Sequence, residues 1–314
     1  MLPRHRLPVC LAVLLFAIGN SLGTASAQSP AVRLATSAAE TYAQAFYAQD
    51  LGLYKKAGIA VDVDTLATGA AVSAAVLNGS ADIGVATMIN LANAVTHAVP
   101  IVIIAPATMS TPAAPTGVLC VAKSSKYMTA KDFDGQTIAV PALKQTADLA
   151  ARAWLSKGGL DPAKANIIEA PFSEMASSLD NGTYAGAVIS EPALTKTIKG
   201  GKVRCFPEAF QAIAPTFMLA AWFTTKAYAD KNPDLVRKVA AALTEAGAWA
   251  NAHQSDSAVI VAKVNKIDVD TIRGEVRPVY AETIRLNEIQ PQLDAGYKFG
   301  FLTRPVTASE LMGH

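Results

Sequence analysis

Strand-like runs and helical patterns alternate along most of this 314-residue chain, and this alternation limits the fold more than any other feature. The first strand-like runs are residues 31–36, 59–66, 82–86 and 101–105. The helical patterns between them are residues 43–51, 70–77 and 89–97. Strands and helices that alternate at this spacing form βαβ crossovers around a mostly parallel sheet. We therefore predict an α/β fold.

A second unit of the same kind follows. Its predicted strands are residues 117–122, 137–140, 167–168 and 185–189, and its predicted helices are residues 147–155 and 175–179. Residues 215–224 then predict a strand that crosses back to the first unit, and residues 233–253 predict a long helix. We expect two doubly wound lobes joined by a two-segment hinge. Residues 28–122 and 216–314 would form the first lobe, and residues 123–215 the second.

The first 27 residues have the three-part pattern of a secretory signal peptide. Arg4 and Arg6 give a basic start, an apolar run covers residues 7–18, and Ala-Ser-Ala at residues 25–27 predicts the cleavage point. The apolar run is shorter than the roughly 20 residues that a membrane-spanning helix needs. Cys10 lies inside this run, which argues against a lipid-modified cysteine. We expect a soluble protein that is exported to the periplasm.

The exported part of the chain is close to neutral. The leader holds two of the 27 basic residues and none of the 25 acidic residues. Charges of one sign form no long block, which argues against nucleic acid or an anionic membrane as a partner. We expect a monomer that binds a small molecule.

Two cysteines, Cys120 and Cys205, remain after the leader. A disulfide between them is chemically allowed in the periplasm. A chain of this size does not need one, and free cysteines behave as small buried apolar residues. From the sequence we therefore favour two separate buried cysteines over a disulfide.

Several ordered motifs resemble a known family. The longest, residues 46–59, contains Gly-Leu-Tyr-Lys-Lys-Ala-Gly-Ile. The others are residues 77–84, 132–140, 179–187, 190–192 and 232–234. Phe133 replaces the usual leucine of one motif, and Ala185-Gly186 replaces the usual acidic residue of another. Over nearly its whole exported length the chain resembles the SsuA/TauA/THI5-like (NMT1-type) periplasmic solute-binding proteins.

This resemblance implies a type II periplasmic binding protein fold and a role in an ABC importer. The chain would capture a small organic solute by lobe closure and deliver it to an inner-membrane permease with its ATPase. The solute would be a sulfonate, another small organic anion or a pyrimidine-like heterocycle. A ligand-sensing accessory protein of a two-component system is the alternative from another functional class.

Ligands of doubly wound sheets bind beyond the carboxyl ends of the strands, where helix N-termini attract anions. This rule and the resemblance predict ligand contacts at Ser37, Tyr42, Thr68, Gly69, Thr87, Thr108, Gln145, Thr146, Glu191 and Trp222. The threonines that precede helices have helix capping as an alternative role. Glu191 has three possible roles: binding an amine-bearing ligand, fixing a helix start, or closing a hydrogen bond between the lobes. Trp222 has core packing as its alternative.

We find no catalytic constellation in the sequence and predict a protein that is not an enzyme. His97 and His253 lie alone in helical patterns, and the cysteines lack metal-ligand spacing. We therefore predict no metal and no cofactor. Some enzymes share this bilobal fold, and the THI5-type pyrimidine synthases are one case. The cysteine-rich motif of those synthases is missing here.

Overall fold

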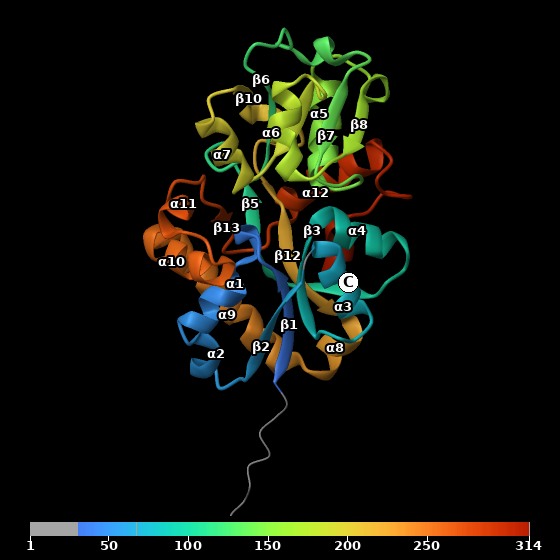
Figure 1. The fold of residues 1–314 in the computed structure, drawn as a ribbon. Helices are drawn as coiled ribbons and strands as arrows, with labels where there is room; N and C mark the ends of the chain where they lie inside the picture. The colour runs from blue at the N-terminus through green and yellow to red at the C-terminus, as the bar shows by residue number, and fades with distance from the viewer. Residues whose placement is uncertain (1–30, 67, 314) are drawn as a thin grey trace, which may run out of the picture. The chain divides into compact units, whose positions relative to one another are not determined.

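The structure is a computed structural model that describes residues 31–66 and 68–313. The predicted leader, residues 1–27, lies outside the described residues. The described strands form two five-stranded sheets and one three-stranded sheet, with helices packed around them (Figure 1). The predicted α/β class is therefore confirmed. We call the first sheet with its helices the first lobe, and the second sheet with its helices the second lobe.

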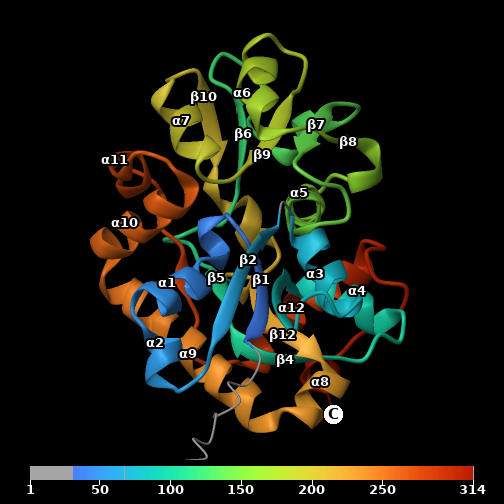
Figure 2. The ribbon, with the colours of Figure 1, turned by 60° about the horizontal axis from the view of Figure 1, so that its bottom comes forward.

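The first sheet has the strand order β2 (Val61–Leu66), β1 (Val32–Ser37), β3 (Ile83–Thr87), β12 (Ala220–Thr225) and β4 (Ile101–Pro106). β1 pairs in parallel with β2 and with β3, whereas β12 is antiparallel to both of its neighbours. One face is covered by α1 (Gln44–Asp50) and α9 (Pro233–Ala252), and the other by α3 (Gly69–Leu77) and α4 (Met88–Thr96) (Figure 2). The remaining helices of this lobe are α2 (Leu53–Lys56), α8 (Lys226–Lys231), α10 (Gln254–Asn265), α11 (Val269–Arg273) and α12 (Leu286–Lys298).

The second sheet has the strand order β10 (Val203–Phe206), β6 (Val118–Ala122), β9 (Gly186–Ile189), β7 (Thr137–Val140) and β8 (Asn166–Glu169). Its helices are α5 (Thr146–Lys157), α6 (Phe172–Asp180) and α7 (Ala193–Lys199). The short 3-10 helices are η1 (Glu40–Tyr42), η2 (Ala130–Phe133), η3 (Pro162–Lys164), η4 (Pro207–Ala212) and η5 (Ala308–Met312).

The division of the chain into lobes stays a prediction, and the strand pairing argues for one change to it. We predicted that the first lobe runs to residue 122. β6 instead pairs with β9 and β10 of the second sheet. The first crossing between the lobes therefore precedes Val118. The sequence pattern could not show this, because an apolar strand fits the interior of either sheet.

A third sheet lies where the chain crosses between the lobes. It consists of β11 (Phe217–Met218), β5 (Thr108–Ser110) and β13 (Val279–Tyr280), all antiparallel. The predicted crossing strand at residues 215–224 is thus split into β11 and β12. β5, β10 and β13 were not predicted, because two to four residues are too few for a clear alternation of apolar and polar side chains.

A close helix approach explains the glycine in the middle of β3. A Cβ atom on Gly84 would lie 2.7 Å from a methyl carbon of Val76 and 2.8 Å from one of Val72. Both valines are buried on α3. Only a residue without a side chain lets α3 pack this tightly on the strand.

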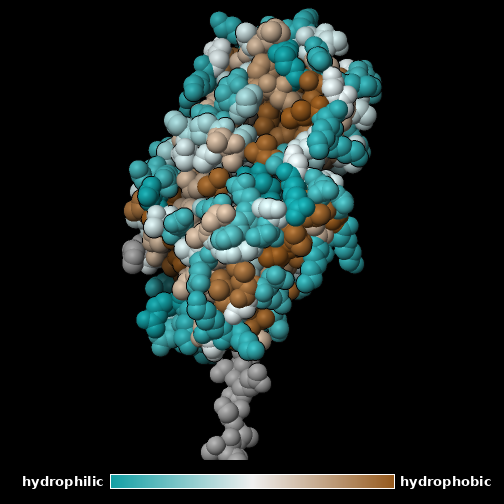
Figure 3. Space-filling model, turned by 90° about the vertical axis from the view of Figure 1, so that its left-hand side faces the viewer, coloured by the Kyte–Doolittle hydropathy of each residue, from teal (hydrophilic) through white to brown (hydrophobic). Residues whose placement is uncertain are grey.

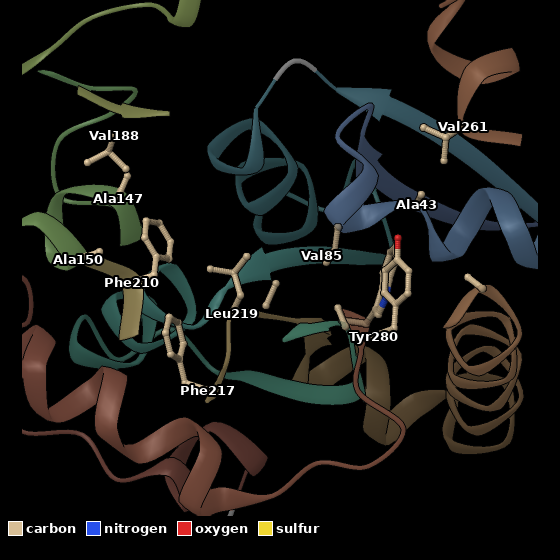
Figure 4. Close-up of a cluster of buried hydrophobic side chains, with 14 of the residues drawn as sticks. Ala43, Val85, Ala147, Ala150, Val188, Phe210, Phe217, Leu219, Val261 and Tyr280 are labelled. Carbon is tan, nitrogen blue, oxygen red and sulfur yellow. The ribbon is translucent and has the colours of Figure 1, made fainter. Parts of the chain in front are cut away.

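One apolar core cluster runs through the crossing region and includes residues of both lobes. Figure 4 shows Ala147, Ala150, Phe210 and Phe217 on the left, Leu219 and then Val85 nearer the centre, and Tyr280 and Val261 on the right. These side chains are all buried. Because apolar burial stabilises by about 25 cal/mol per Å², this continuous packing holds the crossing segments in place.

Trp222 and Gln44 form a hydrogen-bonded pair inside the first lobe. Trp222 is fully buried, and its indole N–H donates to Gln44 Oε1 at 2.8 Å. The amide nitrogen of Gln44 donates to the carbonyl oxygens of Pro106 and Leu243, at 3.2 Å and 3.1 Å. A buried polar side chain is tolerated when its donors and acceptors are satisfied, as they are here. This pair joins α1, β12, β4 and α9.

Cys120 and Cys205 form a disulfide, so our preference for two separate buried cysteines was wrong. The two residues face each other across the antiparallel pair β6 and β10. β10 follows β6 by more than 80 residues and was not predicted. For this reason the sequence could not reveal that the cysteines are neighbours.

The disulfide should contribute strongly to stability. It joins cysteines that are 85 residues apart, and loop closure of this length restricts the unfolded chain by about 4 kcal/mol. We expect reductant to lower the free energy of unfolding by about 2–5 kcal/mol, measured by urea denaturation. The Cys120→Ala/Cys205→Ala double variant is the control, and reductant should leave it unchanged. Identical curves for the oxidised and reduced protein would contradict this assignment.

Candidate functional site

The carboxyl edge of the first sheet gathers several of the predicted site residues. Ser37 is the last residue of β1 and is buried. The Thr36 hydroxyl donates to the carbonyl oxygen of Tyr42 at 2.8 Å, which folds the loop before η1 back onto the strand. The Thr108 hydroxyl donates to the carbonyl oxygen of Thr41. These bonds hold Ser37, Tyr42 and Thr108 in one neighbourhood.

Tyr42 is the aromatic side chain of this neighbourhood. It is partly exposed and packs against the main apolar core. Burial raises the pKa of Tyr42 to about 12. Near neutral pH its hydroxyl group therefore keeps its proton and is able to donate a hydrogen bond.

Two further predicted residues cap helix starts at the same edge. The Thr68 hydroxyl accepts the Ala71 N–H at 3.1 Å, at the start of α3, where Gly69 is the first helical residue. The Thr87 hydroxyl accepts the Asn90 N–H at 3.3 Å, at the start of α4. The capping role that we gave as an alternative is thus present in both. Each cap leaves other first-turn N–H groups of its helix without an intrahelical partner, as at any helix start.

Two predicted contacts lie in the interior of the protein. Trp222 is fully buried and bonded to Gln44, so its ring belongs to the core and does not line a surface. Core packing, the alternative role of Trp222, is therefore the one observed, and a ligand contact at Trp222 stays a prediction. Thr108 is also fully buried, with its hydroxyl group engaged by Thr41. β-Strand position alone did not reveal which side of the sheet each residue faces.

The start of α5 is one part of the second lobe that lies against the first lobe. Lys144 Nζ donates to the carbonyl oxygen of Gly300 at 2.9 Å and lies 4.9 Å from the ring centre of Phe301. Leu149 packs in one buried cluster with Ile89 and Phe301. The first turn of α5 is thus next to the junction between the lobes.

Thr146 is the first residue of α5 and is only 5% exposed. Its hydroxyl oxygen is buried and has no hydrogen-bond partner among residues 31–66 and 68–313. The N-cap residue, Gln145, makes no side-chain cap bond with the described part of the chain. A buried hydroxyl without a partner costs about 1–3 kcal/mol. The same first turn holds the buried carboxylate of Asp148, which accepts the Lys144 N–H at 2.9 Å and pairs with Arg152. The Thr146 hydroxyl and the first-turn N–H groups are the groups here that suit an oxygen-rich acceptor.

Glu191 performs two of its three predicted roles. Its Oε2 atom accepts the Thr195 N–H at 2.9 Å, and its Oε1 atom accepts the Thr195 hydroxyl at 2.8 Å, which fixes the start of α7. Oε1 also accepts the N–H of Val276 at 3.2 Å. Val276 lies between α11 and β13 of the first lobe, so this is a hydrogen bond between the lobes.

Glu40 and Arg277 were not predicted from the sequence. They link η1, which contains Tyr42, to the segment that makes the Val276–Glu191 hydrogen bond. Arg277 Nε donates to Glu40 Oε1 at 2.7 Å, and the two side chains are 8% and 10% exposed. The Tyr47 hydroxyl donates to the same Glu40 oxygen at 3.3 Å. Glu40 belongs to η1, the loop that carries Tyr42. The two partners are 237 residues apart, so no local pattern pairs them.

A hollow of about 520 Å³ lies elsewhere, between α5 and α12. Its lining residues are Ala153, Ser156, Lys157, Ala212, Ile213, Pro291, Asp294, Ala295, Lys298 and Phe299. None of the predicted contact residues lines it. Within the described chain, no cluster of three or more His, Cys, Asp or Glu side chains could hold a metal ion. No helix among the described residues combines the length and apolar character needed to cross a membrane.

Residues 40–257 match the protein family described as NMT1/THI5 like. The chain belongs to this family. Within it, the chain is 28% identical over 193 residues to the taurine-binding periplasmic protein of Escherichia coli (strain K12). The matched region is 61% of this chain and 58% of that protein, so it spans less than two thirds of the relative.

Solved structures show a likeness in fold. The periplasmic aliphatic sulphonate binding protein SsuA from Escherichia coli has a TM-score of 0.73 and 18% identity, over 90% of this chain and 97% of that one. The periplasmic nitrate-binding protein NrtA from Synechocystis PCC 6803 has a TM-score of 0.70 and 17% identity, over 90% of this chain and 84% of that one. At these identities the likeness concerns the fold. The predicted periplasmic binding protein fold is confirmed.

The hydroxyl group of Thr146 gives a test of the site that requires no ligand. In Thr146→Val a methyl group replaces a buried hydroxyl that has no described partner. We expect the free energy of unfolding to stay the same or rise by up to about 2 kcal/mol, because the desolvation cost disappears. In the control Thr244→Val, the lost hydroxyl donates to Ala240 O at 2.9 Å within α9, and we expect no gain. Destabilisation of Thr146→Val by more than about 1 kcal/mol in urea denaturation would show that the hydroxyl has a structural partner.

Proposed function

We propose that this protein is the periplasmic substrate-binding component of an ABC importer. The predicted leader would export the chain, and the two lobes would close around one small organic anion. The closed protein would then deliver the anion to an inner-membrane permease with its ATPase. The protein would act as a monomer and catalyse no reaction.

The hydroxyl of Thr146, which has no hydrogen-bond partner among the residues that the structure describes, is the observation that carries this proposal. It stands at the start of a 12-residue helix, next to the junction between the lobes. Helix starts favour negative charge through their free N–H groups and the helix dipole. An oxyanion at this position would accept bonds from the Thr146 hydroxyl and from first-turn N–H groups.

An anion fits the site better than an amine-bearing heterocycle. Such a heterocycle would need a free carboxylate as its partner, and Glu191 was the candidate. Both oxygens of Glu191 already accept hydrogen bonds from Thr195 or Val276. The taurine-binding relative and the two structural neighbours described above are named for taurine, aliphatic sulphonates and nitrate, and all of these carry an oxyanion group.

In the proposed mechanism, η1 and the starts of α3 and α4 provide the first-lobe side of the site. Ser37, Tyr42, Gly69 and the caps Thr68 and Thr87 would lie on this side. Gln145 and Thr146 would provide the second-lobe side. A ligand that touches both sides binds the closed arrangement better than the open one and so shifts the population toward closure.

Isothermal titration calorimetry tests the ligand class. The mature protein would first be screened by thermal shift against alkanesulfonates, taurine, nitrate, aromatic carboxylates and pyrimidines. We expect an oxyanion to bind, and Thr146→Val to weaken its affinity by about 10- to 100-fold, since a hydrogen bond to a charged group contributes about 1.5–3 kcal/mol. Thr244→Val should bind as the wild type does. Binding of a pyrimidine without binding of any anion would overturn the assigned ligand class.

The sensing alternative is tested by reconstitution. An importer component should stimulate ATP hydrolysis by its permease complex in proteoliposomes when the ligand is present. A protein that binds its ligand, leaves the ATPase rate unchanged and stimulates a histidine kinase would instead be a sensor.

A further inference from the structure

A buried glutamate lies beside the hydrogen bond that joins the lobes. Glu275 is 8% exposed, and its Oε1 atom is buried without a hydrogen-bond partner in the described part of the chain. The next residue, Val276, donates its N–H to Glu191 of the second lobe. The residue after that, Arg277, is bonded to Glu40. Residues 275–277 therefore connect the second lobe to the loop that carries Tyr42.

Charged groups from three elements surround Glu275. Glu191 comes from the segment just before α7, Lys199 is the last residue of α7, Glu40 comes from η1, and Arg277 comes from the same segment as Glu275. Lys199 Nζ is 3.0 Å from the position that a Cβ atom on Gly274 would occupy, which places it directly over this segment. Three carboxylates thus share the region with one arginine and one lysine. Val276 itself is 40% exposed. Figure 3 shows the side of the molecule on which α7, α10 and α11 lie.

The environment of Glu275 disfavours its ionised form. Burial is the largest cause, repulsion from Glu191 and Glu40 adds to it, and together they raise the pKa of Glu275 to about 7 from the ordinary 4.5. The attraction of Arg277 and Lys199 opposes this shift. Separation of the lobes would remove Glu191 and admit water, and the pKa would then fall towards its ordinary value.

We propose that Glu275 is a proton-operated latch on lobe closure. With its carboxyl group neutral, residues 275–277 stay bonded to Glu191 and the lobes remain together. With the group ionised, repulsion from Glu191 weakens the contact and favours separation of the lobes. The latch rests on the lobe closure of the proposed function, and it makes that closure depend on pH.

The direction of the pH effect follows from linkage. The Glu275 carboxyl group holds its proton more tightly in the closed arrangement than in the open one, so acid favours closure. The closed population should fall as pH rises from about 4.5 to about 7, by at most tenfold per pH unit for one proton, and level off above 7. A protein that binds an anion in this way would hold it more firmly in a more acidic periplasm.

Hydrogen exchange in the ligand-free protein tests the latch. The protection factor of the Val276 N–H would be measured by mass spectrometry between pH 5 and pH 8, after correction for the intrinsic exchange rate. We expect protection in the wild type to fall by 10-fold or more between pH 5 and pH 7. Glu275→Gln, which cannot ionise, should keep the low-pH protection throughout. Glu282 is an exposed glutamate of the same lobe. The variant Glu282→Gln is therefore the matched control and should behave as the wild type.

A second variant tests the role of Glu191. Glu191→Gln keeps an acceptor for Val276 but removes the repelling charge, so the midpoint of the pH dependence should move to lower pH. Constant protection in the wild type, or an unchanged pH dependence in Glu275→Gln, would overturn the proposal. Because no ligand is used, this result is independent of the solute screen. A failed screen would contradict the proposed function alone, and a flat exchange profile would contradict the latch alone.

Discussion

β12 runs antiparallel between β3 and β4 in the first sheet, and it carries the chain back from the second sheet. The N–H of Leu219, just before β12, donates to Thr108 O at 2.8 Å, and the carbonyl of Leu219 accepts the Met88 N–H at 2.9 Å. These two bonds tie the returning chain to the hinge strand β5 and to the start of α4. The helix starts of the first lobe are consequently held beside the crossing between the lobes, which is the first-lobe side of the proposed site.

The junction between the lobes combines two kinds of contact. Through its middle runs the buried apolar packing around Phe210 and Phe217, which separation of the lobes should leave intact. At its sides lie the hydrogen bonds of Lys144 to Gly300 and of Val276 to Glu191. Partly exposed polar contacts contribute about 1 kcal/mol or less each. In the proposed mechanism, a ligand or a proton would act on these weak contacts and on the small buried cluster of Ile89, Leu149 and Phe301.

The sequence predicted what depends on near neighbours along the chain. The alternation of strands and helices located most strands of the two large sheets and the helices α1, α3, α4, α5 and α9. Helix capping, the alternative role given for the threonines before helices, is present at Thr68 and Thr87. It could not predict contacts between distant residues. Val276 and Glu191 are 85 residues apart, and Arg277 and Glu40 are 237 apart. Trp222 shows the same limit, because its burial against Gln44 depends on the packing of α1 on the sheet.

Small-angle X-ray scattering of the mature protein tests most directly whether the two lobes trap a solute between them. Scattering would be recorded without ligand and with a saturating concentration of the anion identified by calorimetry. The account predicts a smaller radius of gyration in the saturated wild type than in the unliganded protein, and the same compaction in Thr146→Val only at about 10- to 100-fold higher ligand concentration. Unchanged dimensions of the wild type at proven saturation would contradict it.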